Sequence, residues 1–168
     1  LHGIAADLVT LLQQTIDTAR AISEQMRPAS LGLLGLPQAL RQALQQFGER
    51  HALATTVDIE AGLPALNEDS ATQIFRIVQE ALTNVARHAQ ASRVELRLRR
   101  CDGALELCLA DDGRGIGALP RRPGAIGLFS MAERALEIGA TLSIAAGAPR
   151  GTVLTLRLPL PAAQDDAA

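Results

Sequence analysis

Three polar side chains recur at every fourth position of one predicted helix. Residues 75–88 contain no Gly or Pro, and the apolar residues among them recur at helical spacing. Glu80, Asn84 and His88 therefore follow one another along a single flank of that helix. A carboxylate and an amide oxygen are suitable ligands for a hard divalent ion, and a carboxylate or an imidazole can act as a base. Taken alone, this row is better explained as a solvated helix face.

A buried carboxylate is predicted at the end of a hairpin. Asp102-Gly103 is a strong two-residue turn signal, which predicts a hairpin over residues 93–111. In that register Asp111 shares the apolar face with the leucines of the second strand, while Arg99 and Glu106 lie opposite each other on the other face. A carboxylate on a buried face needs a partner, because leaving it unpaired is costly.

Glycine-rich backbone follows this carboxylate directly. Residues 113–117 read Gly-Arg-Gly-Ile-Gly, and Gly124 and Gly127 come soon after. Such backbone can approach a ligand closely and donate N–H groups to phosphate. Thr152 shares a face with the leucines of the last strand, so it also points inward. An adenine amino group would satisfy the buried carboxylate, and phosphate oxygens would complete the shell of a Mg²⁺ ion held by Asn84. Together these groups predict a Mg·ATP pocket.

Each of these elements also has a simpler explanation when it is considered alone. The glycine run is then an ordinary loop, Asp111 caps the segment that follows it, and Thr152 is a strand residue after a Gly turn. His88 is then an ordinary histidine at a helix C-terminus. Their joint occurrence in this order favours the nucleotide site.

The rest of the pattern predicts the elements that position these groups. Apolar residues at steps of three and four predict a helix over residues 4–26 that ends at Pro28. A second helix is expected to begin near Leu36, with Pro37 in its first turn. The later elements are a strand at 55–60, a helix from the N-cap Asn67 to about Gln90, the hairpin, a helix at 128–138, and strands at 141–145 and 152–158.

This order predicts an α+β fold: a two-layer sandwich of one mixed sheet with helices on one face, preceded by a long N-terminal helix. The chain has 168 residues, enough for one domain with a core and an extra element. A net charge of −2 and the absence of Trp and Tyr give no reason to expect nucleic acid as a partner. Cys101 and Cys108 are offset on the hairpin, so free thiols are expected, as suits the cytoplasm.

Several segments together resemble the ATP-binding domain of sensor histidine kinases from two-component systems. The resemblance covers about residues 5–160, and it implies a Bergerat-type fold that binds ATP with Mg²⁺. The segments are residues 79–89 (QEALTNVARHA, its N box), 111–117 (DDGRGIG, its first glycine box), 124–135 (GAIGLFSMAERA, its second glycine box), 150–159 (RGTVLTLRLP, its closing strand) and 26–40 (MRPASLGLLGLPQAL, the signature of the nitrate/nitrite-sensor subgroup).

The resemblance also implies a role for each matching residue. Glu80 would be the catalytic base or a polarising carboxylate, Asn84 would bind Mg²⁺, and Asp111 would accept a hydrogen bond from the adenine amino group. The other implied ATP-binding residues are Arg87, His88, Gly113, Gly115, Ile116, Gly117, Gly127, Leu128 and Thr152.

The implied activity is transfer of the ATP γ-phosphate to a histidine, for relay to an aspartate of a response regulator with a helix-turn-helix output domain. In this family an acidic residue follows the phosphoacceptor histidine, whereas His2 precedes Gly3. We therefore expect that histidine on a helix outside this chain. Residues 1–34 would be the second dimerisation helix and a linker, residues 35–161 the catalytic domain, and residues 162–168 a disordered tail.

The parent protein would be a homodimeric inner-membrane kinase with this domain in the cytoplasm. The alternatives are an ATPase module of the same fold, related to gyrase and chaperone ATPases, and a degenerate ATP-sensing scaffold. The gyrase-type machines use a Lys that reaches the γ-phosphate, and all 16 basic residues of this chain are Arg.

Overall fold

The computed structural model describes residues 29–115 and 126–161. The predicted helix at 4–26, residues 116–117 of the first glycine segment, residues 124–125 of the second and the tail at 162–168 lie outside these ranges. The described elements are α2 (Ala29–His51), β1 (Ala54–Ile59), α3 (Glu68–Asn84), the π-helical turn η1 (Val85–Ala89), β2 (Arg93–Cys101), β3 (Ala104–Asp111), α4 (Ile126–Glu137), β4 (Thr141–Ala146) and β5 (Thr152–Pro159).

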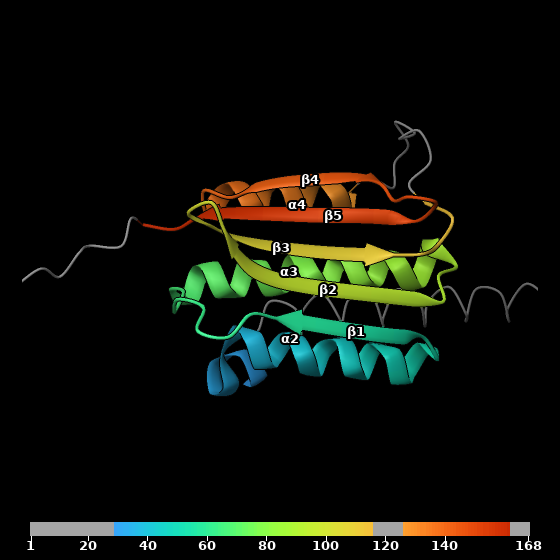
Figure 1. The fold of residues 1–168 in the computed structure, drawn as a ribbon, viewed down its shortest axis with the longest axis horizontal. Coiled ribbons are helices and arrows are strands. Elements are labelled where there is room, and N and C mark those ends of the chain that lie inside the picture. Colours follow the sequence, from blue (N-terminus) through green and yellow to red (C-terminus); the bar gives the residue numbers. More distant parts are fainter. Residues whose placement is uncertain (1–28, 116–125, 162–168) are drawn as a thin grey trace, which may run out of the picture.

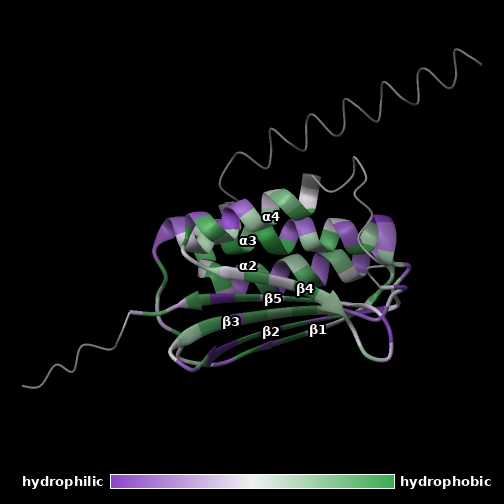
Figure 2. Cartoon of the chain, turned by 90° about the horizontal axis from the view of Figure 1, so that it is seen from above, coloured by the Kyte–Doolittle hydropathy of each residue, from purple (hydrophilic) through white to green (hydrophobic). Residues whose placement is uncertain are grey.

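The strands form one mixed sheet, and the helices cover one of its faces. The strand order is β1-β2-β3-β5-β4. β1 is parallel to β2, whereas the other neighbours are antiparallel. Figures 1 and 2 show α2, α3 and α4 packed side by side on the same face. The two-layer α+β sandwich predicted from the element order is confirmed for the described residues.

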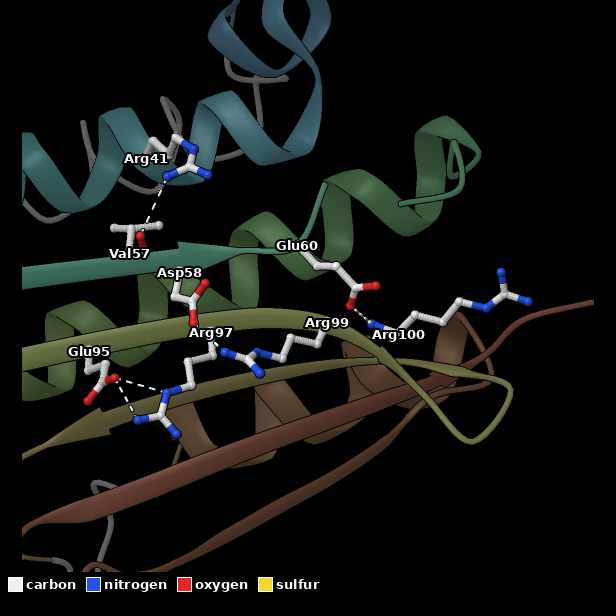
Figure 3. A network of polar contacts seen from close by, with 8 residues as sticks. All are labelled: Arg41, Val57, Asp58, Glu60, Glu95, Arg97, Arg99 and Arg100. Carbon is white, nitrogen blue, oxygen red and sulfur yellow. Dashed lines mark hydrogen bonds and ion pairs between the residues drawn. The ribbon is translucent and has the colours of Figure 1, made fainter. Parts of the chain in front are cut away.

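The hairpin between β2 and β3 has the predicted register. Asp102 and Gly103 both have positive φ, at 48° and 71°, as a tight hairpin turn requires. Arg99 lies opposite Glu106 in that register, but the charge pairs differ from the expected one. On the outer face of the sheet, Arg99 forms an ion pair with Asp58 (Figure 3). Glu106 lies 3.6 Å from Arg157. Arg99 of β2 thus pairs with β1 instead of β3, whereas Glu106 pairs with Arg157, its register partner on β5.

Alternation along the strands places the leucines of the sheet against the helices. Leu96, Leu107 and Leu156 are each at most 1% exposed, and they pack in one cluster with apolar residues of α2 and α3. The helices contribute their apolar seams, as the 3.6-residue period predicted. Cys101 and Cys108 are free thiols on this hairpin, as expected from their offset.

Local capping signals fix where the helices begin and bend. Asn67 caps α3: its Oδ1 accepts a 2.7 Å hydrogen bond from the backbone N–H of Ser70. Within α2, Gly35 has non-helical angles (φ 73°, ψ 166°), so the segment is two helices joined at a kink. The predicted helix start near Leu36 matches this break. Helical residues also precede the kink, which the sequence pattern did not predict.

Polar side chains hold α4 against α3. The amide nitrogen of Gln73 donates to Glu137 at 2.7 Å, and its amide oxygen accepts from Arg134 at 3.0 Å. These contacts fix the C-terminal half of α4 relative to the helix that carries Glu80. None of the described helices is both long enough and apolar enough to cross a membrane.

Candidate functional site

Four segments that are distant in the sequence meet at one end of the sheet. The C-terminal end of α3, the end of β3 and the start of β5 lie together there (Figure 1). The register confirms this placement, because Asp111, the last residue of β3, lies opposite Thr152, the first residue of β5. The N-terminus of α4 reaches the same place, as shown by the contact between Gly127 and Glu80.

Glu80 lies directly against the backbone at the start of α4. A Cβ atom added to Gly127 would overlap Oε1 of Glu80 and would lie 3.1 Å from its Cδ. Only a residue without a side chain therefore allows the carboxylate to occupy this position. Glu80 and Asn84 are both half-buried, so the carboxylate and the amide lie at the margin of the core and not in bulk water.

The last turn of the helix is wider than the sequence pattern predicted. The expected α-helix to about Gln90 ends at Asn84, and the π-helical turn η1 replaces its final turn. Gln90 then ends the helix in the left-handed region, with φ 52°. Arg87 and His88 lie in this turn with exposed side chains, so they extend from the rim of the site. Such turns recur at functional sites.

The predicted burial of Asp111 is confirmed. Its residue is 8% exposed, and its neighbours across the sheet are Val94 on one side and Thr152 on the other. Its Oδ1 accepts a 2.8 Å hydrogen bond from the backbone N–H of Gly113. The capping role considered from the sequence is therefore present, but it uses only one oxygen. Oδ2 has no hydrogen bond to any residue that the structure describes.

Three glycines lie where the glycine loop approaches its neighbouring segments too closely for a side chain. A Cβ at Gly113 would overlap the carbonyl oxygen of Ala89, and one at Gly115 would lie 2.9 Å from the carbonyl oxygen of Gly151. Gly151 itself, at φ 98°, lies against the carbonyl oxygen of Asp111. The glycine loop is thus enclosed between the end of η1 and the start of β5. This close backbone approach is what a phosphate-binding loop needs.

Asp112 is a polar anchor of the site that sequence reasoning did not single out. Its Oδ1 accepts from the backbone N–H groups of Ser92 and Arg93 at 2.8 and 2.9 Å, and its Oδ2 accepts from the hydroxyl of Ser92 at 2.5 Å. The Ser92 hydroxyl and the two N–H groups lower the pKa of Asp112 from 3.8 to about 2. The only sequence signal was a second acidic residue before the glycine, with a Ser just before the first hairpin strand.

The remaining predicted residues divide into those that the structure places and those outside it. Thr152 and Leu128 are half-buried, at the start of β5 and in the first turn of α4. Ile116 and Gly117 lie outside the described residues. A cavity of about 450 Å³ lies elsewhere, between α2 and β1, and it contains none of the candidate residues. No cluster of three or more acidic, His or Cys side chains suited to a metal occurs in the described ranges.

The comparison with protein families identifies the fold at this site. Residues 69–162, more than half of the chain, match the family of histidine kinase-, DNA gyrase B- and HSP90-like ATPases. The chain belongs to this ATPase family. The matched region begins at the first turn of α3 and contains every residue of the site described above.

Relatives of this ATPase domain are sensor histidine kinases. The chain is 32% identical over 152 residues to the oxygen sensor histidine kinase NreB of Staphylococcus carnosus, covering 89% of this chain and 44% of that protein. It is 33% identical over 141 residues to the sensor histidine kinase LiaS of Bacillus subtilis, covering 84% and 39%. The chain therefore spans less than half the length of these curated relatives.

A solved structure agrees with this assignment. The histidine kinase domain of the Erythrobacter litoralis EL346 blue-light activated histidine kinase superposes with a TM-score of 0.63 at 26% identity, covering 74% of this chain and 61% of that one. The five-stranded sheet with helices on one face is thus the fold of a histidine kinase ATPase domain.

Proposed function

We propose that this end of the sheet binds ATP with Mg²⁺ and that Asp111 recognises the adenine. The observation that carries the proposal is the state of the Asp111 carboxylate. It lies on an apolar face, Gly113 holds one of its oxygens, and the other has no described partner. A carboxylate oxygen that lies on an apolar face without a protein partner favours a donor on an incoming ligand, and the adenine amino group supplies one. Thr152 lies across the sheet, where its hydroxyl assists this recognition.

The donor set at the end of α3 fits a Mg²⁺ ion held together with a nucleotide. Mg²⁺ prefers oxygen ligands, and it is commonly bound by one or two protein groups, with phosphate oxygens and water completing its shell. Asn84 offers one half-buried amide oxygen, and no three-carboxylate cage accompanies it in the described residues. In this proposal the bound ion neutralises charge on the phosphates. Arg87 and His88, exposed on η1, contact phosphate from the rim.

Glu80 is the proposed catalytic residue. Its carboxylate is held against the start of α4 through the space left by Gly127, one helical turn from Asn84. In the parent protein it takes up the proton released from the attacking histidine nitrogen, or polarises that nitrogen. A proton acceptor acts mainly in the transition state, so Glu80 contributes to transfer more than to binding.

The parent protein is, in this proposal, a sensor histidine kinase that passes the phosphate on to a response regulator with a helix-turn-helix output domain. Its relatives are sensor kinases that this chain covers only in part. Residues 35–161 form the catalytic unit, and the kink at Gly35 supports a boundary there. The phosphoacceptor histidine and the rest of the dimerisation region belong to the parent homodimer, anchored at the inner membrane.

Two substitutions on α3 test the division of roles. Asn84→Ala should abolish the Mg²⁺-dependent part of ATP binding, measured by calorimetric titration with and without the ion. Glu80→Gln should bind Mg·ATP normally and lower the rate of phosphohistidine formation in the parent kinase by about 10²–10⁴-fold.

Thr83→Ala is the matched control on the same helix. Its hydroxyl donates to the carbonyl of Gln79 at 2.9 Å and to no other residue that the structure describes, so its loss should leave binding and transfer unchanged. Normal transfer by Glu80→Gln would refute the catalytic role of Glu80, and Mg²⁺-independent binding by the unmodified chain would refute the role of Asn84.

A further inference from the structure

Asp112 forms a polar junction beside the candidate site, where the first glycine segment meets the start of β2. At this junction Asp112 accepts three hydrogen bonds, two from backbone N–H groups and one from a hydroxyl, all from Ser92 and Arg93. Its own backbone N–H donates to the carbonyl of Arg93 at 3.3 Å. Four contacts thus connect one residue of the glycine box to Ser92 and to Arg93, the first residue of β2.

The position of this junction gives it a geometric consequence. Ser92 lies two residues beyond Gln90, where the helix carrying Glu80 and Asn84 ends. Asp112 follows Asp111, whose carboxylate lies on the buried face. The junction therefore sets the separation between the end of that helix and the carboxylate on β3.

A second contact joins the first glycine segment to η1, at the end of the helix that carries Glu80 and Asn84. The backbone N–H of Arg114 donates to the carbonyl of Ala89 at 2.8 Å, and Gly113 lies against that carbonyl so closely that a Cβ would overlap it. Gly113 in turn holds Oδ1 of Asp111. A shift of Asp112 would move Gly113, and with it the orientation of the Asp111 carboxylate.

We propose that Asp112 is a positioning residue for adenine recognition: by binding Ser92 and Arg93 it fixes the direction in which the free oxygen of Asp111 points. This inference rests on the proposed nucleotide site and extends it to a residue that does not touch the nucleotide. The Ser92 hydroxyl and the backbone N–H groups lower the pKa of Asp112, because they donate hydrogen bonds to its ionised form. The junction is thus made by charge-assisted bonds, which are stronger than neutral ones.

The inference predicts a selective loss, not a general one. Asp112→Ala should raise the Kd for Mg·ATP roughly tenfold, because the charge-assisted bond between adenine and Asp111 is misaligned. The Kd for purine riboside triphosphate, which lacks the amino group, should change by less than about twofold, since that analogue cannot use the bond. A general loss of stability would weaken both ligands equally.

Three variants of this chain make the test decisive. Asp112→Asn keeps an oxygen that can accept from both N–H groups, so it should retain most of the preference for ATP. Ser92→Ala removes only the hydroxyl bond and should reduce that preference partly. Asp58→Ala removes an acidic residue of the outer sheet face, where it pairs with Arg99, and should leave the preference unchanged.

The outcomes are distinguishable by titration calorimetry, with thermal unfolding as a check on folding. A folded Asp112→Ala protein with the wild-type ratio of the two Kd values would overturn the inference. If that variant does not unfold cooperatively, Ser92→Ala decides, and an unchanged ratio in it would overturn the inference equally. Failure of the unmodified chain to bind Mg·ATP would instead remove the proposed function, and this inference with it.

Discussion

Replacing Gly127 by alanine should separate catalysis from folding in this domain. In the structure Oε1 of Glu80 occupies the space where a Cβ would be, and Cδ and Cγ of Glu80 lie 3.1 and 3.5 Å from that position. Because carbon atoms pack best at about 3.5–4.0 Å, the carboxylate has to retreat by roughly 1 Å. A misplacement of about 1 Å at a reacting group lowers a rate by about 10²-fold. We expect a loss of that size in phosphohistidine formation.

The effect on stability should have the opposite sign or be small. Gly127 lies in the first turn of α4 and is absent from the residues with positive φ. Alanine is better than glycine inside a helix by about 1 kcal/mol, which offsets the displacement of a flexible side chain. The midpoint of thermal unfolding should therefore stay near that of the unmodified chain. Binding of Mg·ATP should also persist, since Asp111 and Asn84 are not displaced by the new methyl group.

The assay is the rate of acid-labile phosphohistidine formation by the parent kinase, with ATP affinity measured separately by calorimetry. The double variant Gly127→Ala, Glu80→Asp shortens the carboxylate by one methylene and should recover part of the lost rate. Such recovery would show that the two residues interact. A Gly127→Ala kinase that transfers phosphate within about twofold of the wild-type rate would refute the placement of Glu80 as the reacting carboxylate.

Three other perturbations test the rest of the site. Asp111→Asn should weaken ATP binding by about 1.5–3 kcal/mol in a folded domain, measured by calorimetry, and unchanged affinity would contradict the adenine assignment. Because the folded-state pKa of Asp112 is lowered from 3.8 to about 2, its contribution to stability is present above pH 3.8 and is lost as the pH falls through 2. Asp112→Asn should remove this part of the pH dependence of the free energy of unfolding, measured by denaturant titration. Gly151→Ala should destabilise the domain by about 3 kcal/mol, because φ is 98° and a Cβ overlaps the carbonyl of Asp111. Gly139→Ala, with φ 70° and no atom within 4 Å of the added Cβ, should cost only about 1 kcal/mol. Equal losses of the two variants in urea unfolding would show that the overlap is not decisive.

The burial of Asp111 could be predicted because each step of the reasoning was local. Asp102-Gly103 specified the turn, the turn specified the register, and a period of two then placed residue 111 on the leucine face. The N-cap at Asn67 and the interruption before Leu36 were predictable for the same reason, since each depends on a residue and its immediate neighbours. The parallel pairing of β1 with β2 could not be read in this way, because it depends on packing across the sheet.

The contacts that complete the site join segments far apart in the sequence. Asp112 binds a residue 20 positions before it, and Glu80 lies against Gly127. The resemblance assigned roles to Glu80 and Gly127, but it gave no reason for the two to touch. The π-helical turn was missed because Val85–Ala89 consists of residues that fit an α-helix equally well. Its formation accompanies the docking of the glycine loop on the carbonyl of Ala89, and no local pattern encodes that docking.

The π-helical turn has a consequence for the length of the chain at this point. A π-turn accommodates one more residue per turn than an α-helix, so removing a single residue from Val85–Ala89 should let the helix continue in ordinary geometry. That shorter helix would be locally more regular, yet its end would be rotated and drawn back by about 1.5 Å. Ser92 would then no longer reach Asp112. The extra residue serves as a spacer, and insertions or deletions here should be tolerated by the helix but not by the nucleotide site.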